Sequence, residues 1–297
     1  MISILIPTYN DDCTTLVAAL VRQAAAIDQL DWEIVVCDDA STDAVVSAHH
    51  QEIGAIDGCR LLHHETNRGR AVSRNHLAQA AQGDWLLFID GDATIIDDRF
   101  LAKYLAAAQS ESVCYGGYRM MPGPQGNLRW IYEKAAADKH TVVCRRQHPY
   151  DSFNISNLLI RRDIMLANPL DERFRHYGYE DVLLGKLLEA QRIPIGHIDA
   201  PVGYFRYEDN AHYIAKTEEG LRTLYTFRKE LQGFSKLLDF CQTIPAPLLA
   251  IARFAFRRAR NTMRRQLESA HPRLILFSLY KLGYFLSLSK DEADRKD

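Results

Sequence analysis

The first hundred residues alternate short apolar runs with stretches of helical periodicity, and this alternation limits the folds open to the chain more than any other feature. It is typical of βαβ units, in which helices join parallel strands. We expect strands at residues 3–7, 33–37, 60–63 and 85–89. We expect helices between them at residues 12–26, 43–53 and 70–82. The sequence therefore predicts an α/β protein with a Rossmann-like, mostly parallel central sheet flanked by helices.

Polar side chains follow each of these expected strands. In open α/β sheets, ligands bind beyond the carboxyl ends of the strands, so we expect the side chains to converge on one crevice. They are Thr8, Tyr9 and Asn10 after the first strand, Asp38 and Asp39 after the second, Asn67 to Arg70 after the third, and Asp90 and Asp92 after the fourth.

The segment Asp90-Gly91-Asp92 ends the fourth apolar run abruptly. Two carboxylates one residue apart form a hard-oxygen site that suits a divalent cation holding a phosphate. The alternative is a solvated turn before the helix expected at Asp97, because turns also favour Asp and Gly. The glycine-rich dinucleotide fingerprint and the phosphate loop of nucleotide hydrolases are both missing from the sequence. A bound diphosphate would therefore need a metal to neutralise it.

Beyond residue 110 the pattern becomes mixed. We expect a helix at residues 130–138 and a strand at residues 153–161, the latter carrying Asn154 and Asn157. Glu180 and Asp181 then precede an apolar helical pattern, where the helix dipole favours carboxylates. They are either functional acids or ordinary first-turn capping acids.

Charge divides the chain sharply. Between Lys236 and Lys290 there are ten basic residues and two acidic ones, whereas the whole chain carries a net charge of −2. Arg253, Arg257, Arg260 and Arg264 recur at helical spacing among apolar residues. This pattern predicts a basic amphipathic helix on an anionic membrane surface, or else a helical appendage packed on the rest of the protein. No run of about 18 uncharged apolar residues is present, which disfavours a spanning helix.

Cysteine usage and the nature of the basic segment bear on location and partners. Six cysteines are scattered without a Cys-x-x-Cys pair, and the chain starts directly with a strand-like run. We therefore expect no secretory leader and free thiols in a reducing cytosol. Long aliphatic clusters interrupt the arginines, so we expect no nucleic-acid binding by this segment.

Five motifs resemble the ordered motifs of family 2 glycosyltransferases over residues 1–190. They are ILIPTYN at residues 4–10, VVCDDASTD at 35–43, NRGRAVSRN at 67–75, FIDGD at 88–92 and GYED at 178–181. The resemblance implies a glycosyltransferase A fold. It also implies inverting transfer of a sugar from a nucleotide sugar, usually a UDP-sugar, with Mn²⁺ or Mg²⁺.

The resemblance also implies a role for each matching residue. Pro7, Thr8 and Tyr9 would line the base pocket, with Tyr9 stacking. Asp38, together with Asp39, would hydrogen-bond the uracil edge. Arg70 and Arg74 would close over the nucleotide and neutralise phosphate, since Arg suits bidentate contacts. Asp90 would reach the ribose or the metal, Asp92 would be the direct metal ligand, and Asp181 would be the general base.

Chemistry supports the last assignment. An acceptor hydroxyl that attacks the anomeric carbon needs a carboxylate within hydrogen-bond reach, and Asp181 with Glu180 beside it can supply one. Inversion needs one base and one leaving-group activator. A retaining double displacement would need a second carboxylate as nucleophile, and we find no distinct candidate.

Two departures from the family pattern concern the metal. Ala93 follows Asp92 where many relatives carry a third acid, and Tyr204 stands where a close subgroup, which residues 198–204 and 216–219 resemble, often has a histidine. His212 and His197 are then the candidates for a third protein ligand. These departures make a nucleotide-binding or scaffolding protein with a degenerate site the main alternative. A nucleotidyltransferase is disfavoured, because it would show a glycine-rich basic signature after the first strand.

These observations predict a catalytic domain at residues 1–232, with a nucleotide-binding half at about 1–110 and an acceptor half at about 111–232. A basic, apolar helical region would follow at residues 233–297. We expect an enzyme that adds a sugar to a growing cell-surface glycan, free or lipid-linked, at the inner face of the cytoplasmic membrane. The sequence gives no indication of the oligomeric state.

Overall fold

The computed structural model describes residues 1–288, and these divide into two compact units. The first unit comprises Met1–Met121, Ala137–Arg175 and Leu184–Phe205. The second comprises Pro122–Ala136, His176–Leu183 and the described residues from Arg206 onward. The chain therefore passes between the units several times. The predicted division at residue 232 stays a prediction.

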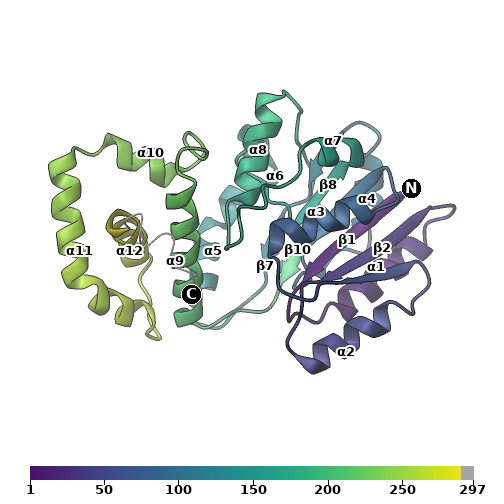
Figure 1. The fold of residues 1–297 in the computed structure, drawn as a ribbon, viewed down its shortest axis with the longest axis horizontal. Coiled ribbons are helices and arrows are strands. Elements are labelled where there is room, and N and C mark those ends of the chain that lie inside the picture. The colour runs from purple at the N-terminus through teal and green to yellow at the C-terminus, as the bar shows by residue number, and fades with distance from the viewer. Residues whose placement is uncertain (289–297) are drawn as a thin grey trace. The chain divides into compact units, whose positions relative to one another are not determined.

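Within the described residues, the first unit is built on a seven-stranded sheet of order β3-β2-β1-β4-β8-β6-β9. The strands are β1 (Ile2–Thr8), β2 (Trp32–Asp38), β3 (Cys59–His63), β4 (Trp85–Ile89), β6 (Val113–Tyr115), β8 (Asn157–Arg161) and β9 (Gly196–His197). The first four strands are parallel, whereas β8 runs antiparallel to both β4 and β6 (Figure 1). The predicted mostly parallel sheet is thus confirmed, and its four predicted strands lie within one residue of the predicted bounds.

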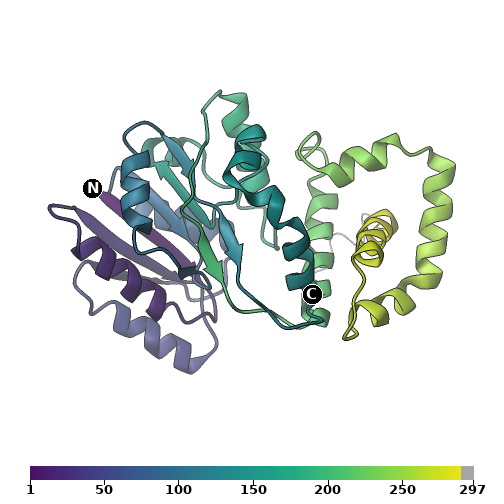
Figure 2. The ribbon, with the colours of Figure 1, turned by 180° about the vertical axis from the view of Figure 1, so that it is seen from behind.

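Helices cover both faces of this sheet (Figures 1 and 2). One face packs against α1 (Thr14–Ala25), α2 (Ala44–Ile53) and α4 (Phe100–Ala107). The other packs against α3 (Arg70–Ala80), α7 (Arg162–Ala167) and α8 (Glu180–Ala190). Alternate residues of β1 point to opposite faces, so that Ile4 contributes to the first core and Leu5 to the second. Burial on both faces explains why the strands read as continuous apolar runs.

A second sheet and two short helices complete the first unit. The three-stranded sheet has the order β5-β10-β7 among the described residues. Its strands are β5 (Thr94–Ile95), β7 (Tyr118–Met120) and β10 (Val202–Tyr204), and the helices are the 3₁₀ turn Ala137–His140 and α6 (Val142–Gln147). The strand expected at residues 153–161 starts only at Asn157. The residues before it turn instead, with Ser156 donating its hydroxyl to the Asn154 side chain.

The second unit is helical in its described part. It contains α5 (Leu128–Ala136), α9 (Asn210–Thr226), α10 (Lys236–Thr243), α11 (Ala246–Leu267) and α12 (Leu274–Ser287). The predicted helix at 130–138 starts two residues early, because the Asn127 side chain accepts the Trp130 amide at 2.9 Å.

A buried glutamate ties three of these helices together. Figure 1 shows α12 between α9 and α11. Glu218 of α9 accepts hydrogen bonds from side chains of both α11 and α12. The Tyr280 hydroxyl of α12 donates to the carboxylate, and Arg260 and Arg264 of α11 lie 3.3 and 3.5 Å from it. Because a buried carboxylate needs such partners, these contacts fix the packing of the helices.

Several arginines of α11 bond to neighbouring helices. Arg253 donates to the carbonyl of Leu286 at 2.7 Å, and Arg260 and Arg264 bond Glu218. Three of the four arginines in the predicted basic row therefore also stabilise the helical packing. Lys290, which was counted in the basic segment, lies outside the described residues.

Candidate functional site

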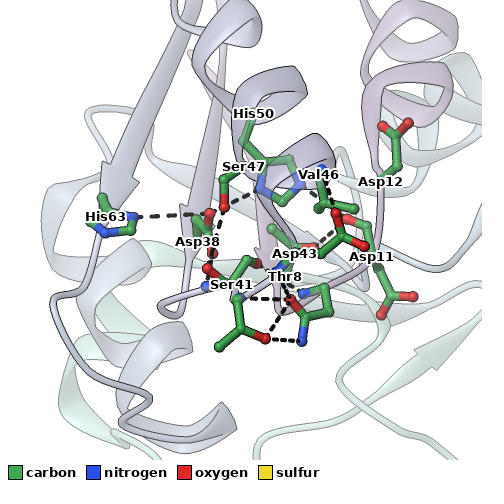
Figure 3. A network of polar contacts seen from close by, with 12 residues as sticks. Thr8, Asp11, Asp12, Asp38, Ser41, Asp43, Val46, Ser47, His50 and His63 are labelled. Atoms are coloured by element: carbon green, nitrogen blue, oxygen red, sulfur yellow. Dashed lines mark hydrogen bonds and ion pairs between the residues drawn. The ribbon is translucent and has the colours of Figure 1, made fainter.

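The carboxyl ends of β1 and β2 are joined by a polar network around Asp38 (Figure 3). One Asp38 oxygen accepts the Ser41 amide at 2.8 Å, and the other lies 3.0 Å from Nδ1 of His50. Burial raises the pKa of the Asp38 carboxyl, but hydrogen bonds from Ser41 and His50 outweigh burial and hold it below its usual range. Asp38 is therefore a carboxylate at neutral pH, and only 2 % of its surface is exposed.

Asn10 fixes the loop after β1 against the loop after β2. Its side-chain oxygen accepts hydrogen bonds from the backbone amides of Thr42 and Asp43 at 2.8 and 3.0 Å. The backbone amide of Asn10 donates to the Ser41 hydroxyl at 2.9 Å. Asn10 adopts a φ of 56°, a left-handed conformation that Asn tolerates better than most residues. The neighbouring Tyr9 is 43 % exposed, so its ring is accessible to a ligand.

Asp39 holds the turn that follows β3. Its two oxygens accept the backbone amides of Arg68 and Gly69 at 2.9 and 2.8 Å, and one of them also lies 2.7 Å from Nδ1 of His64. Gly69 has a φ of 89° and precedes α3, a position that favours glycine. Arg70 is exposed at the first residue of this helix, where amide groups favour a bound anion.

The Asp90-Gly91-Asp92 segment is clamped against the end of β1. The Gly91 amide donates to the Pro7 carbonyl at 3.2 Å. A Cβ at Gly91 would lie 2.8 Å from the Thr8 hydroxyl oxygen, closer than side chains tolerate. Glycine is therefore required for Asp90 and Asp92 to leave β4 beside Pro7 and Thr8.

Arg74 of α3 points to the acid pair. Its guanidinium donates to Asp90 at 2.6 Å, and the Arg74 side chain is only 2 % exposed. In this structure the positive charge of Arg74 thus offsets the charge of Asp90. The role in phosphate neutralisation stays a prediction.

Tyr204 of β10 lies near both acids. Burial raises the pKa of its phenol well above its usual value, and the charges of Asp90 and Asp92 raise it further. A protonated Tyr204 offers a hydroxyl donor where the close subgroup often carries a histidine. The phenol is a weak ligand in this form, so a metal ion at this place would depend on the two carboxylates.

The two histidines suggested as a third ligand have other partners. His197 is on β9, separated from β4 by β8 and β6, or about 14 Å at the usual strand spacing. Its Nε2 donates to the Pro149 carbonyl at 3.1 Å. This placement gives no support to His197 as a ligand of a metal at Asp92. His212 lies in the second unit, where its Nδ1 is 2.7 Å from Asp209. Its role as a ligand stays a prediction.

Glu180 and Asp181 start α8 and belong to the second unit. The preceding Gly178 and Tyr179 have φ values of 94° and 73°. A positive φ at a bulky residue such as Tyr179 costs on the order of 1–3 kcal/mol. An Asp181 oxygen accepts the Val182 amide at 2.8 Å, and Glu180 is buried. The predicted role of Asp181 as a base rests on the motif.

The sequence interpretation missed several partners of the site residues. Ser41 and His50 satisfy Asp38, and His64 faces Asp39. The strand register provided a signal for His64. Asp38 of β2 pairs with His63 of β3, so the following residues, Asp39 and His64, lie next to each other. His50 offered no comparable signal, since it reaches Asp38 from a helix.

The family is established by direct comparison. Residues 3–168 match the model described as glycosyl transferase family 2, which is more than half of the chain. The chain therefore belongs to the family 2 glycosyltransferases.

Several curated relatives resemble part of the chain. An uncharacterized glycosyltransferase of Haemophilus influenzae is 26 % identical over 164 residues, covering 55 % of this chain and 63 % of the relative. The Escherichia coli UDP-Glc:alpha-D-GlcNAc-diphosphoundecaprenol beta-1,3-glucosyltransferase WfgD is 27 % identical over 178 residues, covering 59 % of this chain and 65 % of the relative. The chain spans 32 to 63 % of the length of the first three curated relatives.

Solved structures share the glycosyltransferase A fold that the motifs predict. Residues 1–349 of Staphylococcus aureus TarS superpose with a TM-score of 0.52 and 16 % identity, covering 96 % of this chain and 90 % of that one. The mannosyltransferase PcManGT from Pyrobaculum calidifontis, solved with GDP-Man and Mn²⁺, gives a TM-score of 0.55 and 14 % identity, covering 96 % and 84 %. These likenesses confirm the predicted fold.

Proposed function

We propose that this chain transfers a sugar from a nucleotide sugar, expected to be a UDP-sugar, to a hydroxyl group of a growing cell-surface glycan with inversion. The observation that carries the proposal is the acid pair Asp90 and Asp92, which is held against the end of β1 and lies near Tyr204. The Escherichia coli relative is named for UDP-Glc and a lipid diphosphate acceptor, and a Bacillus spizizenii relative for poly(ribitol-phosphate). Both relatives are named glucosyltransferases, which supports hexosyl transfer, and N-acetylhexosaminyl transfer is the alternative.

The donor set fits a hard divalent cation. Asp92 and Asp90 offer carboxylate oxygens, the ligands that Mg²⁺ and Mn²⁺ prefer, and both carboxylates act on the same Tyr204 phenol. Asp92 would hold the ion, and Asp90 would reach it or the ribose while paired with Arg74. Such an ion, when bound, stabilises the negative charge of a departing diphosphate.

The remaining donor contacts follow from the strand ends. Tyr9 would stack on the base above Pro7 and Thr8, and Asp38 would accept a hydrogen bond from the base edge. Asp39 holds the turn before α3, so it would act through the placement of Arg70 at the helix start. Arg70 would then face the phosphates.

Asp181, with Glu180 beside it, would take the proton of the acceptor hydroxyl as that oxygen attacks the anomeric carbon. The bond from that carbon to the diphosphate breaks as the new glycosidic bond forms on the opposite face. A single displacement of this kind inverts the configuration and needs no nucleophilic carboxylate.

The first test is calorimetric titration of the full chain with UDP, GDP, ADP and CDP, with and without Mn²⁺. We expect metal-dependent binding of UDP, which Asp92→Asn removes. Asp97→Asn is the matched control, because Asp97 also lies between β4 and α4 but pairs with Lys103. Metal-dependent UDP binding that survives Asp92→Asn would refute the role of Asp92. Binding of no nucleotide would favour the alternative of a scaffolding protein with a degenerate site.

The base is tested separately. Asp181→Asn should leave UDP affinity unchanged and abolish transfer from the UDP-sugar. Asp163→Asn serves as the control, since Asp163 is also an acid in the first turn of a helix and is exposed and paired with Arg161. Near-normal turnover by Asp181→Asn would exclude Asp181 as the base.

We further propose that α10 and α11 contact an anionic membrane at the inner face of the cytoplasmic membrane. No single helix among residues 1–288 has the length and apolarity of a membrane span, although α10 and α11, bent by 118°, meet that criterion together. Apolar side chains on these two helices are more than half exposed: Phe240, Leu248, Ile251 and Phe254. Arg258 lies over the Phe254 ring at 5.1 Å, so a cation borders the apolar surface.

Cosedimentation with lipid vesicles tests this contact. We expect binding to vesicles that contain anionic lipid, weaker binding to zwitterionic vesicles, and loss of binding in Ile251→Glu. Ile275→Glu is the control, because Ile275 is 80 % exposed but lies on α12. Equal loss in both variants would argue against a surface formed by α10 and α11.

A further inference from the structure

A second cluster of metal-binding residue types lies in the first unit, apart from the acid pair of β4. It consists of Cys37 at the end of β2, His64 just after β3 and His76 in α3. One ligand atom from each of the three residues lies within 4.8 Å of the others. Cys37 and His64 are buried, and His76 is half-buried. Three neighbouring elements of the fold thus bring a thiol and two imidazoles to one point.

The two imidazoles meet edge to edge. Nε2 of His64 is 2.9 Å from Nδ1 of His76, while the ring centroids are 5.1 Å apart and the ring planes differ by 8°. Rings stacked face to face would bring their centroids closer than this. The two nitrogens therefore point at each other nearly in a common plane, as in an N–H···N hydrogen bond, and both rings would have to turn for their lone pairs to converge on one ion.

Asp39 sets the tautomer of His64. Its carboxylate lies 2.7 Å from Nδ1 of His64, so Nδ1–H donates to it and the lone pair is on Nε2. That lone pair is directed to His76, and the Cys37 sulfur lies 3.7 Å from the same nitrogen. A carboxylate behind a histidine is the arrangement that orients histidine ligands in zinc sites.

We propose that Cys37 Sγ, His64 Nε2 and His76 Nδ1 bind a zinc ion, with Asp39 supporting His64 from behind. Sulfur and imidazole nitrogen are the ligands that zinc favours, whereas Asp90 and Asp92 offer only oxygen. The proposal is independent of the proposed transferase function. It adds a structural metal to the chain, distinct from the ion expected at Asp92.

Binding one ion needs a small change of distance and a turn of the two imidazole rings. In a tetrahedral zinc site, neighbouring nitrogens are about 3.3 Å apart and a sulfur–nitrogen pair is about 3.6 Å apart, given the usual bond lengths. The Cys37–His64 distance of 3.7 Å already matches, and the His64–His76 distance of 2.9 Å must open slightly. The fourth position would be filled by water.

The proton balance of binding is simple. Burial raises the pKa of the Cys37 thiol to about 12, so the metal-free thiol is protonated. Zinc displaces that proton to solvent and forms a zinc–thiolate bond. His76 stays neutral but carries its proton on Nε2 instead of Nδ1, which frees Nδ1 for the ion.

Zinc at this place would stiffen the turn before α3. Asp39 joins His64 to the amides of Arg68 and Gly69, so an ion that fixes His64 also fixes Asp39 and the turn that it holds. The ion would thereby connect β2, β3 and α3 beside the expected nucleotide site. Without zinc, the same residues form a hydrogen-bonded chain from Asp39 through His64 to His76.

The test uses the full chain, stripped of metal with a chelator and titrated with Zn²⁺ in competition with a chromophoric chelator. We expect one zinc ion per chain, with affinity lowered about 100-fold or more in Cys37→Ser and in His76→Ala. Cys59→Ser and His148→Ala are the matched controls, because Cys59 lies on the neighbouring strand and His148 is exposed in the same unit. Circular dichroism checks that each variant is folded.

Cobalt substitution gives a second readout. Co²⁺ should produce a sulfur-to-metal charge-transfer band that is present in Asp92→Asn and absent in Cys37→Ser. Persistence of the band in Cys37→Ser, or zinc affinity equal in the four cysteine and histidine variants, would overturn the proposal. Failure of the wild-type chain to bind zinc would also overturn it and leave the hydrogen-bonded chain alone.

Discussion

The pair formed by Arg74 and Asp90 predicts a strong energetic coupling between α3 and the end of β4. The guanidinium and the carboxylate are 2.6 Å apart at their nearest atoms, and the side chains are 2 % and 18 % exposed. Opposite charges about 4 Å apart attract by about 4 kcal/mol at the effective dielectric constant of a protein. Measured couplings between contacting residues are about 0.5–3 kcal/mol, so we expect a coupling of about 2 kcal/mol for this pair.

A double-mutant cycle measures this coupling. Arg74→Met and Asp90→Asn should each lower the free energy of unfolding by about 2–3 kcal/mol, because each removes a charged hydrogen bond from a largely buried partner. The double variant should lose about 3 kcal/mol rather than the sum of the single losses.

Fluorescence can confine the measurement to the first unit. The chain has three tryptophans, and Trp130 is in the second unit while Trp32 and Trp85 are in the first. Urea unfolding in a Trp130→Phe background therefore reports on the unit that contains the pair. Additive losses in the double variant would refute the coupling. Additive losses would instead favour a primary role for Arg74 at the phosphate. In that case Arg74→Met should bind UDP more weakly than the wild-type chain does but bind uridine equally well.

Three further outcomes follow from single contacts. Gly91→Ala should cost about 1–3 kcal/mol and weaken nucleotide binding, because the new methyl group meets Thr8; unchanged urea unfolding and UDP affinity would contradict this. Burial, aided by the charges of Arg145 and Arg146, lowers the pKa of His197 to about 4. Between about pH 4 and 6.5 the unfolded chain therefore binds more protons than the folded chain, and the free energy of unfolding falls as the pH drops through that window. His197→Gln should remove up to about 3 kcal/mol of that pH dependence, measured by urea unfolding at pH 7 and pH 4.5. Tyr280→Phe removes the hydroxyl that donates to Glu218 and should lower the thermal stability of the second unit by about 1–2 kcal/mol, whereas an unchanged melting temperature would show that the two arginines suffice.

The parallel half of the sheet was predictable because its signal is local. Residues 2–8 and 85–89 are apolar on both faces, and only a strand covered by helices on both sides accepts such a run. The same reasoning located the polar residues at the strand ends. It could not find that β8 inserts antiparallel between β4 and β6, because that order depends on long-range pairing.

The partners of the site residues were less predictable for a similar reason. Arg74 reads as a basic residue near a nucleotide motif, but its helix turns the side chain into the protein, where it meets Asp90. His76 reads as an ordinary helical residue, and only the fold brings it to His64. A motif identifies which residues matter, whereas the contact that each one makes depends on the packing of distant segments.

The alternating path of the chain between the two compact units has a consequence for its synthesis and dissection. The large sheet contains β9, and the small sheet contains β10. Both sheets of the first unit therefore remain incomplete until residue 204 has left the ribosome. By then two segments of the second unit have already been made, without the helices from α9 onward that they pack against. Neither unit is a contiguous piece of the gene, so no truncation at a single point can yield one of them without segments of the other.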